Sequence, residues 1–406
     1  MGTREVDDRA FPQIRVRTNE IMVTNIALPR IAKFGAGSID ELGSIVAQLG
    51  ISRPVVVTDR YLTETGQTER LVKILQAAGS EPAVFSETVP DPTVASLEDG
   101  LTLVRAHDAD GIIGFGGGSP MDTAKALAVL SANGGDIASY KVPSNYMGPA
   151  LPIVAVPTTS GSGSEATQFT VITDGSTDEK MLCPGLSFLP IAVVVDFELT
   201  VSMPARLTAD TGVDALTHAI EAYVSRRASP FTDALALAAM RAISLHVRRA
   251  YADGTDREAR EAMMLASTQA GMAFSNSSVA LVHGMSRPIG GHFHIAHGLS
   301  NAMLLPAVTK FSIDSAVERY ADCARAMGVV AESADTREAA YALVTELQQL
   351  CADVEVPTPR SYGVDAASWE AQVDIMATQA LASGSPANNP RTPTHDEIVD
   401  LYRQIF

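Results

Sequence analysis

Short apolar runs alternate with helical patterns through the first half of the chain. Continuous apolar runs bounded by turn residues predict buried strands. These runs are Pro54–Asp59, Ala83–Phe85, Gly111–Phe115, Leu151–Val156 and Ile191–Asp196. The helical patterns between them are near Leu71–Ala78, Thr93–His107 and Met121–Leu130. Repeated strand–helix alternation is typical of a parallel sheet with helices on both faces, so the first half is predicted to be an α/β domain.

The second half has long stretches rich in Ala, Leu and Arg, with helical spacing and few β-branched runs. Pro230, followed by Thr232 and Asp233, is typical of a helix start. Further helices are predicted at Arg257–Ala273, Asp314–Met327, Thr336–Asp353 and His395–Ile405. We therefore predict an α/β domain at residues 1–203 and an all-helical domain at 204–406.

Size, charge and cysteine usage narrow the class of protein. The 406 residues exceed the roughly 250–300 that one core usually serves, which agrees with two domains. The net charge of −17 argues against binding to nucleic acid or to an anionic membrane surface, and no apolar run approaches the ~20 residues of a membrane span.

The three cysteines form no CxxC pair, which favours a cytoplasmic location and excludes a disulfide scaffold. Residues 1–20 lack the apolar core of a secretory signal and are expected to form a disordered arm.

Four side chains are candidates for a metal site. Asp214 and His218 are four residues apart in a predicted helix, so both lie on one face, with Cβ atoms roughly 5–6 Å apart. His283 and His297 lie near the two ends of a later segment that holds four of the eight histidines. Three imidazoles and one carboxylate suit a divalent transition metal. Taken separately, they also fit satisfied polar residues on a helix face and in a glycine-rich loop.

Two loops follow predicted strands and carry glycines and small hydroxyls. GFGGGSPMDTAK (114–125) joins a strand to a helix whose free N–H groups suit a phosphate, although it is neither a P-loop nor a full GxGxxG sequence. PTTSGSGSEAT (157–167) follows the next strand. Two such loops at the carboxyl ends of parallel strands mark a ligand cleft. The alternatives are a purely structural turn and a surface loop.

Asp59 ends the predicted strand VVVTD. A carboxylate at this place accepts hydrogen bonds from ribose hydroxyls and repels a 2′-phosphate, which favours NAD over NADP. A helix or turn cap explains the residue equally well.

Taken together, these elements resemble the iron-containing (group III) alcohol dehydrogenase family. The similarity extends from about Ile31 to the C-terminus. The matching stretches are VVVTDRYL, GFGGGSPMDTAK, PTTSGSGSE, GVDALTHAIEAYVS, AGMAFSNS, VHGMSRPIGGHFHIAHGLSNAMLLP and NPRTP. The resemblance implies an N-terminal dinucleotide-binding domain, a helical C-terminal domain and an active site in the cleft between them.

The resemblance also implies roles for individual residues. The metal ligands would be Asp214, His218, His283 and His297. The NAD-binding residues would be Asp59, Gly117, Gly118, Ser119, Asp122, Thr158, Thr159, Ser162 and Lys180. Phe274 resembles a residue of the substrate pocket. The implied metal is Fe²⁺, with Zn²⁺ as the alternative, and the implied assembly is a homo-oligomer, a dimer or larger.

One position departs from the family pattern. Many members carry a histidine four residues after the third metal ligand, and this chain has Arg287 there. Arginine cannot act as a general base near neutral pH. The proton route is therefore assigned to water, His292 or His294, and Arg287 either binds an anionic group or forms a salt bridge across the cleft.

The predicted function is a metal-dependent alcohol dehydrogenase, or aldehyde reductase, that transfers a hydride between a primary alcohol or diol and NAD. Because Arg287 could hold a carboxylate, a 4-hydroxybutyrate dehydrogenase or a hydroxyacid–oxoacid transhydrogenase of the same family is the close alternative. A metal-dependent lyase on the related fold and a nucleotide-binding module without catalysis are the more distant alternatives.

Overall fold

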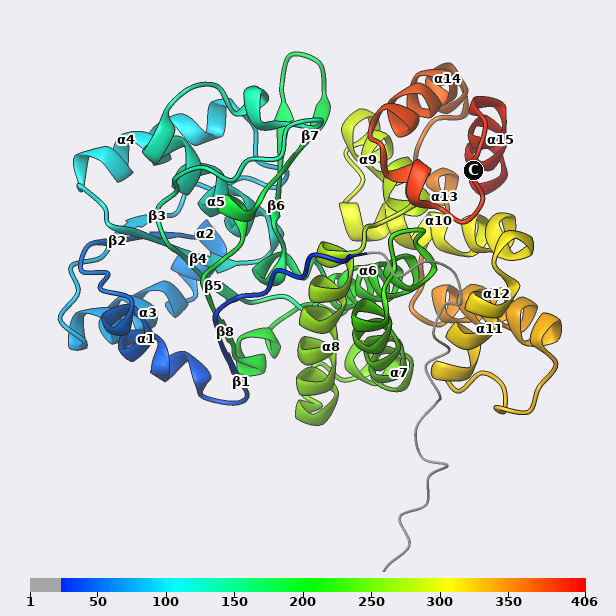
Figure 1. Cartoon of the computed structure of the whole chain (residues 1–406), viewed down its shortest axis with the longest axis horizontal. Helices are drawn as coiled ribbons and strands as arrows, with labels where there is room; N and C mark the ends of the chain where they lie inside the picture. The colour runs from blue at the N-terminus through cyan, green and yellow to red at the C-terminus, as the bar shows by residue number, and fades with distance from the viewer. Residues whose placement is uncertain (1–22) are drawn as a thin grey trace, which may run out of the picture.

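A computed structural model describes residues 23–406 (Figure 1). The predicted N-terminal arm, residues 1–20, lies outside the described residues. The described chain has an α/β half followed by a helical half, and the two halves lie side by side. This arrangement confirms the predicted fold class.

The α/β half is built on a six-stranded sheet in the order β1-β8-β5-β4-β2-β3, with every pair parallel. In chain order, the strands are β1 (Ile31–Phe34), β2 (Pro54–Val57), β3 (Ala83–Phe85), β4 (Gly111–Gly116), β5 (Ile153–Pro157) and β8 (Ala192–Val195). All residues of β2, β4, β5 and β8 are buried. Full burial explains why these strands are continuous apolar runs rather than alternating ones.

Helices cover both faces of the sheet. The helices of this half are α1 (Leu42–Gln48), α2 (Arg60–Glu64), α3 (Gln67–Ala77), α4 (Glu98–Ala106) and α5 (Gly118–Asn133). Alternate residues of β2 show the two layers, since Val55 and Val57 share a core with α4 and α5, whereas Val56 packs with α1 and α3. The carboxyl ends of β2, β4 and β5 then lead into the segments that carry the predicted cofactor residues.

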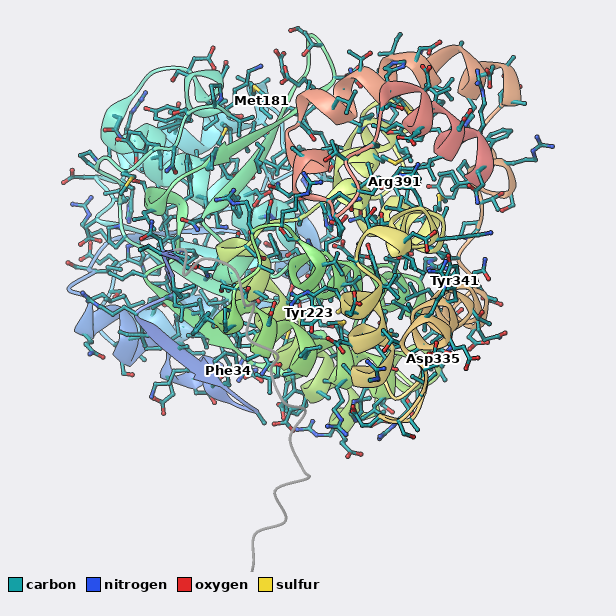
Figure 2. The ribbon with its side chains drawn as sticks, turned by 45° about the vertical axis from the view of Figure 1, so that its right-hand side comes forward. Phe34, Met181, Tyr223, Asp335, Tyr341 and Arg391 are labelled. Atoms are coloured by element: carbon teal, nitrogen blue, oxygen red, sulfur yellow. The ribbon has the colours of Figure 1, made fainter. Side chains whose placement is uncertain are left out.

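An antiparallel hairpin stands apart from the main sheet. It consists of β6 (Phe169–Asp174) and β7 (Glu179–Pro184). The sequence did not predict this hairpin, nor the edge strand β1, because both are only partly buried and carry polar residues among the apolar ones. The hairpin extends beside the helical half in Figure 1. Phe34 on β1 is 44% exposed at the outer edge of the sheet (Figure 2).

The helical half packs around one large hydrophobic core. Its helices are α6 (Ala205–Val224), α7 (Pro230–Ala252), α8 (Arg257–Asn276), α9 (Leu281–Phe293), α10 (His297–Ser312), α11 (Val317–Ala326), α12 (Thr336–Asp353), α13 (Pro359–Tyr362), α14 (Ala366–Ala382) and α15 (His395–Ile405). Within residues 23–406, no helix combines the length and apolar character needed to cross a membrane. Every described strand precedes Pro204, the N-cap of α6, so we propose this residue as the domain boundary.

Candidate active site

A large cleft runs between the two halves and is lined by residues from both. Its volume is about 1760 Å³, which exceeds the roughly 300–1,000 Å³ of a pocket for one small ligand. The lining includes the glycine-rich turn before α5, the loop after β5, and residues of α6, α8 and α9. This space suits a dinucleotide together with a second molecule.

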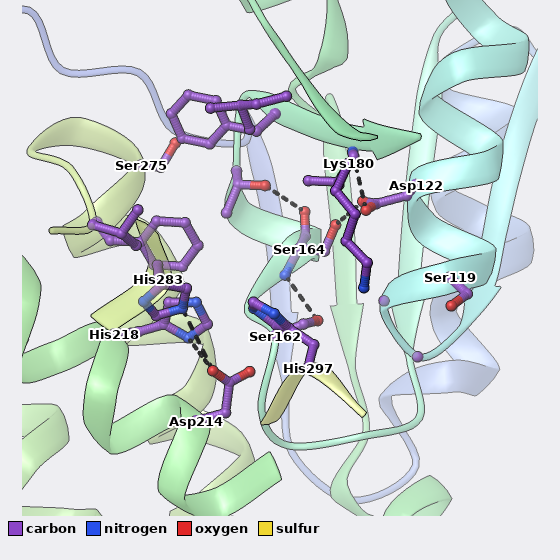
Figure 3. Close-up of a pocket in the computed structure, with 18 of the residues that line it drawn as sticks. Ser119, Asp122, Ser162, Ser164, Lys180, Asp214, His218, Ser275, His283 and His297 are labelled. Atoms are coloured by element: carbon purple, nitrogen blue, oxygen red, sulfur yellow. Dashed lines mark hydrogen bonds and ion pairs between the residues drawn. The ribbon is translucent and has the colours of Figure 1, made fainter. Parts of the chain in front are cut away.

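The four candidate metal ligands meet at one side of this cleft (Figure 3). Asp214 and His218 lie one turn apart on α6, His283 lies on α9, and His297 begins α10. One ligand atom from each residue lies within 4.8 Å of all the others. Asp214 Oδ1 is 3.5 Å from His283 Nε2 and 3.9 Å from His218 Nδ1. Tertiary packing therefore brings together three segments that are well separated in the sequence.

Glu221 fixes the orientation of His283 from behind. Its carboxylate accepts hydrogen bonds from Val282 N at 2.6 Å, Ala280 N at 2.8 Å and His283 Nδ1 at 2.7 Å. With Nδ1 engaged, Nε2 is the atom of His283 that faces Asp214. A carboxylate behind a metal-binding histidine fixes the ring and increases its basicity. The sequence interpretation missed Glu221, although its position seven residues after Asp214 on α6 was a usable signal.

Asn301 contacts three of the four candidate ligands. Its Nδ2 lies 2.6 Å from Asp214 Oδ1, 3.1 Å from His283 Nε2 and 3.2 Å from His297 Nε2. Its Oδ1 is buried and has no hydrogen-bond partner among the described residues. The sequence interpretation also missed this residue, and the available signal was its position four residues after His297 on α10.

The ionisation of the cluster suits a bound cation. Burial lowers the pKa of His218 and of His297 to about 3, so both imidazoles are neutral at neutral pH. Burial opposes the charge of Asp214, but the three imidazoles outweigh it and hold the carboxyl pKa below its ordinary value. Within the described chain, His218 Nδ1 is buried without a hydrogen-bond partner. Neutral imidazoles, an ionised carboxylate and an unsatisfied ring nitrogen fit a divalent metal ion.

Burial also disfavours a charge on His283, but Glu221 and Asp214 overcome this and raise the pKa of the ring. The ring lies between the two carboxylates, at 2.7 Å from Glu221 and 3.5 Å from Asp214. This part of the cluster therefore stabilises positive charge, which is a further reason why a cation fits it.

The two predicted cofactor loops pack against each other. Gly117 caps α5 and Gly118 begins it, which leaves the N–H groups of the first turn available to an anion. A Cβ at Gly117 would lie 3.2 Å from Thr159 Cγ2, and one at Gly118 would lie 3.5 Å from Ser162 Cβ. The small residues thus permit the close approach. The seven loop residues assigned to cofactor binding all line the cleft, and they are Gly117, Gly118, Ser119, Asp122, Thr158, Thr159 and Ser162.

Asp122 and Lys125 connect α5 to the loop after β5. Asp122 accepts hydrogen bonds from Ser164 Oγ at 3.0 Å and Val171 N at 3.2 Å, and burial raises its pKa to about 6. Lys125 is fully buried and donates to Ser164 Oγ at 3.0 Å and to Phe169 O at 2.8 Å. It also donates to Thr167 O and Oγ1, and burial lowers its pKa to about 8. Sequence reasoning missed Lys125, although it lies one turn after Asp122.

Asp59 and Lys180 line the cleft on the α/β side. Asp59 caps α2, since its Oδ1 accepts a hydrogen bond from Leu62 N at 2.9 Å. Asp59 can cap α2 and also bind a ribose, because Oδ1 serves the cap and Oδ2 is left to accept from a ribose hydroxyl. Lys180 Nζ pairs with Asp91 Oδ1 at 2.7 Å, and its side chain is 5% exposed. A Cβ at Gly290 of α9 would lie 2.8 Å from that Nζ, so Lys180 lies where the hairpin meets the helical half.

Comparison with known proteins identifies the family. The model described as "Iron-containing alcohol dehydrogenase" matches residues 29–197, and the model "Fe-containing alcohol dehydrogenase family, C-terminal" matches residues 208–406. The chain belongs to the iron-containing alcohol dehydrogenase family. The predicted family is thereby confirmed, together with the predicted enzyme class, an alcohol dehydrogenase.

Several members of the family are similar over their full length. The NAD-dependent methanol dehydrogenase of Bacillus methanolicus is 36% identical over 385 residues, covering 95% of this chain and 100% of the relative. The lactaldehyde reductase of Escherichia coli (strain K12) is 37% identical over 388 residues, with coverage of 95% and 100%. The crystal structure of a 1,3-propanediol oxidoreductase has a TM-score of 0.91 and 36% identity, with coverage of 95% and 100%.

Aromatic side chains form an apolar wall beside the metal cluster. The ring of Phe274 stacks on His218, with centroids 4.2 Å apart and planes at 12°, and it lies parallel to Phe169 with centroids 6.4 Å apart. Phe274 lines the cleft.

The two positions assigned to catalysis lie in different surroundings. Arg287 lines the cleft, and its Nη1 donates to Ser385 Oγ at 3.0 Å. Within residues 23–406 Arg287 forms no ion pair with a carboxylate, so the described structure does not show the alternative of a salt bridge across the cleft.

His294 caps the end of α9 with a φ of 53°, is exposed, and does not line the cleft. His292 Nε2 contacts Gln379 Oε1 at 2.9 Å, and this residue also lies outside the cleft lining. The structure therefore does not bring either histidine to the candidate site, and neither has a role in the mechanism below.

Proposed function

We propose that the protein is an NAD- and iron-dependent dehydrogenase that interconverts a primary alcohol or diol and the corresponding aldehyde. The observation that carries the proposal is the position of the Asp214–His218–His283–His297 cluster in the same cleft as the glycine-rich turn before α5. A hydride transfer between a bound alcohol and a dinucleotide requires both sites to open into one space.

In this proposal Asp214, His218, His283 and His297 hold the metal, and Glu221 orients His283 through Nδ1. Asn301 Nδ2 contacts the same atoms of Asp214, His283 and His297 that would bind the metal, so it would move aside when the metal binds. When bound, the metal supplies a Lewis acid that polarises the alcohol oxygen and favours its deprotonation. The nitrogen and oxygen donors accept iron or zinc, and the family membership supports iron. Zinc remains the alternative that metal analysis would detect.

For the cofactor, we propose that the N–H groups at Gly118 and Ser119 bind the NAD pyrophosphate. Thr158, Thr159 and Ser162, in the loop after β5, would form the second part of the NAD-binding site. The start of α5 has no side-chain cap and lines the cleft, which supports this arrangement. Asp59 would accept from the ribose hydroxyls, which favours NAD over NADP, while Asp122 and Lys180 hold the loop and the hairpin around the cofactor.

We propose that Phe274 shields the reacting carbon from water, and that NAD, when bound in the cleft, would supply the acceptor for the hydride of that carbon. The alcohol proton leaves to water. Among the described residues that line the cleft, all three histidines belong to the metal cluster, and Arg287 cannot accept a proton near neutral pH. Water is therefore the acceptor that the site supports.

Arg287 supports a second candidate within the same chemistry. A 4-hydroxybutyrate dehydrogenase or a hydroxyacid–oxoacid transhydrogenase would use this cation to hold a substrate carboxylate. A transhydrogenase would keep its nucleotide bound during turnover and reduce little free NAD. Mass spectrometry of the denatured protein would detect such a retained nucleotide.

The test is NADH formation by protein reconstituted anaerobically with ferrous iron, across short alcohols, diols and 4-hydroxybutyrate. We expect turnover that disappears with a chelator and returns with iron. The variant His283→Ala is expected to lose metal and activity while it keeps the wild-type circular dichroism spectrum. Full activity in the metal-free protein would contradict the proposal.

We also propose a cytoplasmic homo-oligomer, a dimer or larger. The three cysteines are free thiols, which suits a reducing compartment. The exposed Phe34 on the edge strand β1 supports association at that edge. Light scattering of the purified protein measures the oligomeric state.

A further inference from the structure

Arg287 is a cation of the cleft wall that has no ion pair with any of the residues 23–406. Burial lowers its pKa to about 10, so the guanidinium keeps its charge near neutral pH. Its one hydrogen bond to a described residue is the contact with Ser385 Oγ. A guanidinium has five N–H groups in a rigid fork, and most of them are left for a ligand. Arg287 is half-buried in the wall of the cleft, and a cation that is partly withdrawn from water normally has an anionic partner, because desolvation is costly.

The carboxylate that acts most directly on Arg287 is already engaged. Glu221 favours the charged form of Arg287, but its oxygens accept hydrogen bonds from Ala280 N, Val282 N and His283 Nδ1. The carboxylate of Glu221 therefore serves the metal cluster and does not form an ion pair with Arg287. An anion that enters the cleft would complete the pairing.

The wall that holds Arg287 is tightly packed. Ser385 begins the short helix η8 (Ser385–Asn388), and a Cβ at Gly284 of α9 would lie 2.7 Å from Pro386 Cγ. At the other end of η8, Asn388 Nδ2 donates to Ser278 Oγ at 2.8 Å. The contact between Arg287 and Ser385 thus joins two fixed elements, and the guanidinium is held in place before any ligand arrives.

Arg287 also lies at a useful position relative to the metal cluster. It follows His283 by four residues on α9, so both side chains share one helix face, with Cβ atoms roughly 5–6 Å apart. The apolar surface of Phe274 lines the same cleft. One molecule could therefore place an oxygen at the cluster, an alkyl chain along Phe274 and an anion at Arg287. This spacing suits a short chain.

We propose that Arg287, held by Ser385, is an anion subsite that makes short hydroxyacids, with a carboxylate at the far end from the hydroxyl, the preferred substrates. This inference rests on the proposed dehydrogenase function and specifies its substrate class. The carbinol carbon gives a hydride to NAD⁺, the hydroxyl proton leaves to water, and the product is the aldehyde acid with its carboxylate unchanged. The cofactor phosphates do not need this arginine, because the start of α5 lies ready for them in the other half.

The first experiment compares 4-hydroxybutyrate with 1,4-butanediol, which has the same carbon chain and no charge, on the iron-loaded enzyme. We expect kcat/KM to be higher for the hydroxyacid, and the ratio of the two values to fall roughly tenfold or more in Arg287→Met. The ratio is measured within one variant, so a partly unfolded sample cannot imitate the effect.

The matched control is Arg227→Met, which removes a positive charge from an exposed residue of the same cleft. We expect this variant to change the ratio by less than about threefold, since exposed charges are screened. An unchanged ratio in Arg287→Met would overturn the proposal. So would an equal fall in both variants, because that result would indicate a general electrostatic effect.

A second experiment does not depend on turnover. Calorimetry of the enzyme with iron and NADH compares butyrate with butyramide, which is similar in shape and neutral. We expect butyrate to bind roughly tenfold more tightly, and Arg287→Met to abolish the difference. Equal binding of the two compounds would overturn the subsite even if the enzyme oxidises alcohols. Tighter butyrate binding without any alcohol oxidation would instead reject the proposed function.

Discussion

Glu221 determines how the candidate metal ligand His283 is held, although it is not one of the four candidate ligands. It fixes the His283 ring through Nδ1, which leaves Nε2 facing Asp214. Partners of this kind fix tautomers and ring orientations, and their loss usually costs much of the metal affinity. The affinity of the site is therefore expected to depend on residues that never touch the substrate.

Replacing Glu221 with Gln should weaken metal binding. The amide removes the negative charge behind His283 and can accept fewer of the three hydrogen bonds that the carboxylate accepts. We expect the dissociation constant for the metal to rise about 10- to 100-fold, measured by competition with a chromophoric chelator. Glu332→Gln, at an exposed position, is the control. Wild-type affinity in Glu221→Gln would show that the contact is not needed for metal binding.

Asp59 offers a separate test of cofactor selection. Asp59→Ser keeps a good helix N-cap for α2 but removes the charge that would repel a 2′-phosphate. We expect the ratio of kcat/KM for NADP over NAD to rise roughly tenfold or more. Asp40→Ser, at an exposed residue paired with Arg70, should leave the ratio as it is. A variant that still rejects NADP would limit Asp59 to its capping role.

At the residue scale, the sequence displays clusters of metal-binding residue types, but it does not display the residues that contact them in the fold. Asp214 and His218 became candidates because of their helical spacing, and His283 and His297 because four of the eight histidines fall in one segment. Lys125 and Asn301 were missed because their importance comes from contacts across 42 and 87 positions of the chain, with Thr167 and Asp214. The structure was likewise needed to show that Arg287 has no ion-pair partner within residues 23–406.

Among the elements, α5 has a double function, because its first turn lies in the cleft and Lys125 in its interior holds the neighbouring loop. The Lys125 ammonium has four oxygen acceptors from Ser164, Thr167 and Phe169. Through these contacts, the helix fixes the segment that leads from the second cofactor loop into β6. The loop is therefore preorganised rather than free to adapt.

Lys125→Met should destabilise the fold. The substitution removes the donor and leaves buried acceptors without hydrogen bonds. It also removes the positive charge that favours the ionised form of Asp122. We expect the free energy of unfolding to fall by about 2–4 kcal/mol, measured by urea denaturation. Lys73→Met, which breaks an exposed pair with Glu69, should leave the free energy of unfolding close to the wild-type value. Equal losses in the two variants would contradict the role given to Lys125.

The elements were predictable to different degrees for a physical reason. Strands β2, β4, β5 and β8 are buried on both faces, so each is a continuous apolar run that the sequence displays. The hairpin β6–β7 is half-buried and contains Thr170, Thr173 and Lys180. Its short, mixed pattern resembles a loop, and only the pairing of the two strands reveals it.

In the whole molecule, the cleft depends on how closely the two halves approach. Gly163 in the loop after β5 meets Gly271 of α8, where a Cβ on Gly271 would lie 2.5 Å from Gly163 O. Nearby, Gln168 Nε2 donates to Ser275 O at 2.7 Å and Thr268 Oγ1 donates to Glu165 Oε1 at 2.7 Å. These contacts align the second cofactor loop with α8, which carries Phe274 and packs against α6, the helix of Asp214 and His218.

Gly271→Ala tests this alignment. The added methyl group meets backbone rather than a flexible side chain, so the halves must shift. We expect a loss of about 1–3 kcal/mol in the free energy of unfolding and a several-fold rise in the KM for NAD. Gly175→Ala is the control, because a Cβ there has nothing within 4 Å. Wild-type values for both quantities in Gly271→Ala would show that the close contact is unnecessary.

The central claim is that the four-residue cluster and the glycine-rich turn form one active site around a metal and NAD. The most direct test is an anomalous difference map at the iron absorption edge, from crystals of iron-loaded protein with NAD. The account predicts one strong peak enclosed by Asp214, His218, His283 and His297, with pyrophosphate density at Gly118 and Ser119. Iron bound elsewhere, or dinucleotide density away from that turn, would contradict it.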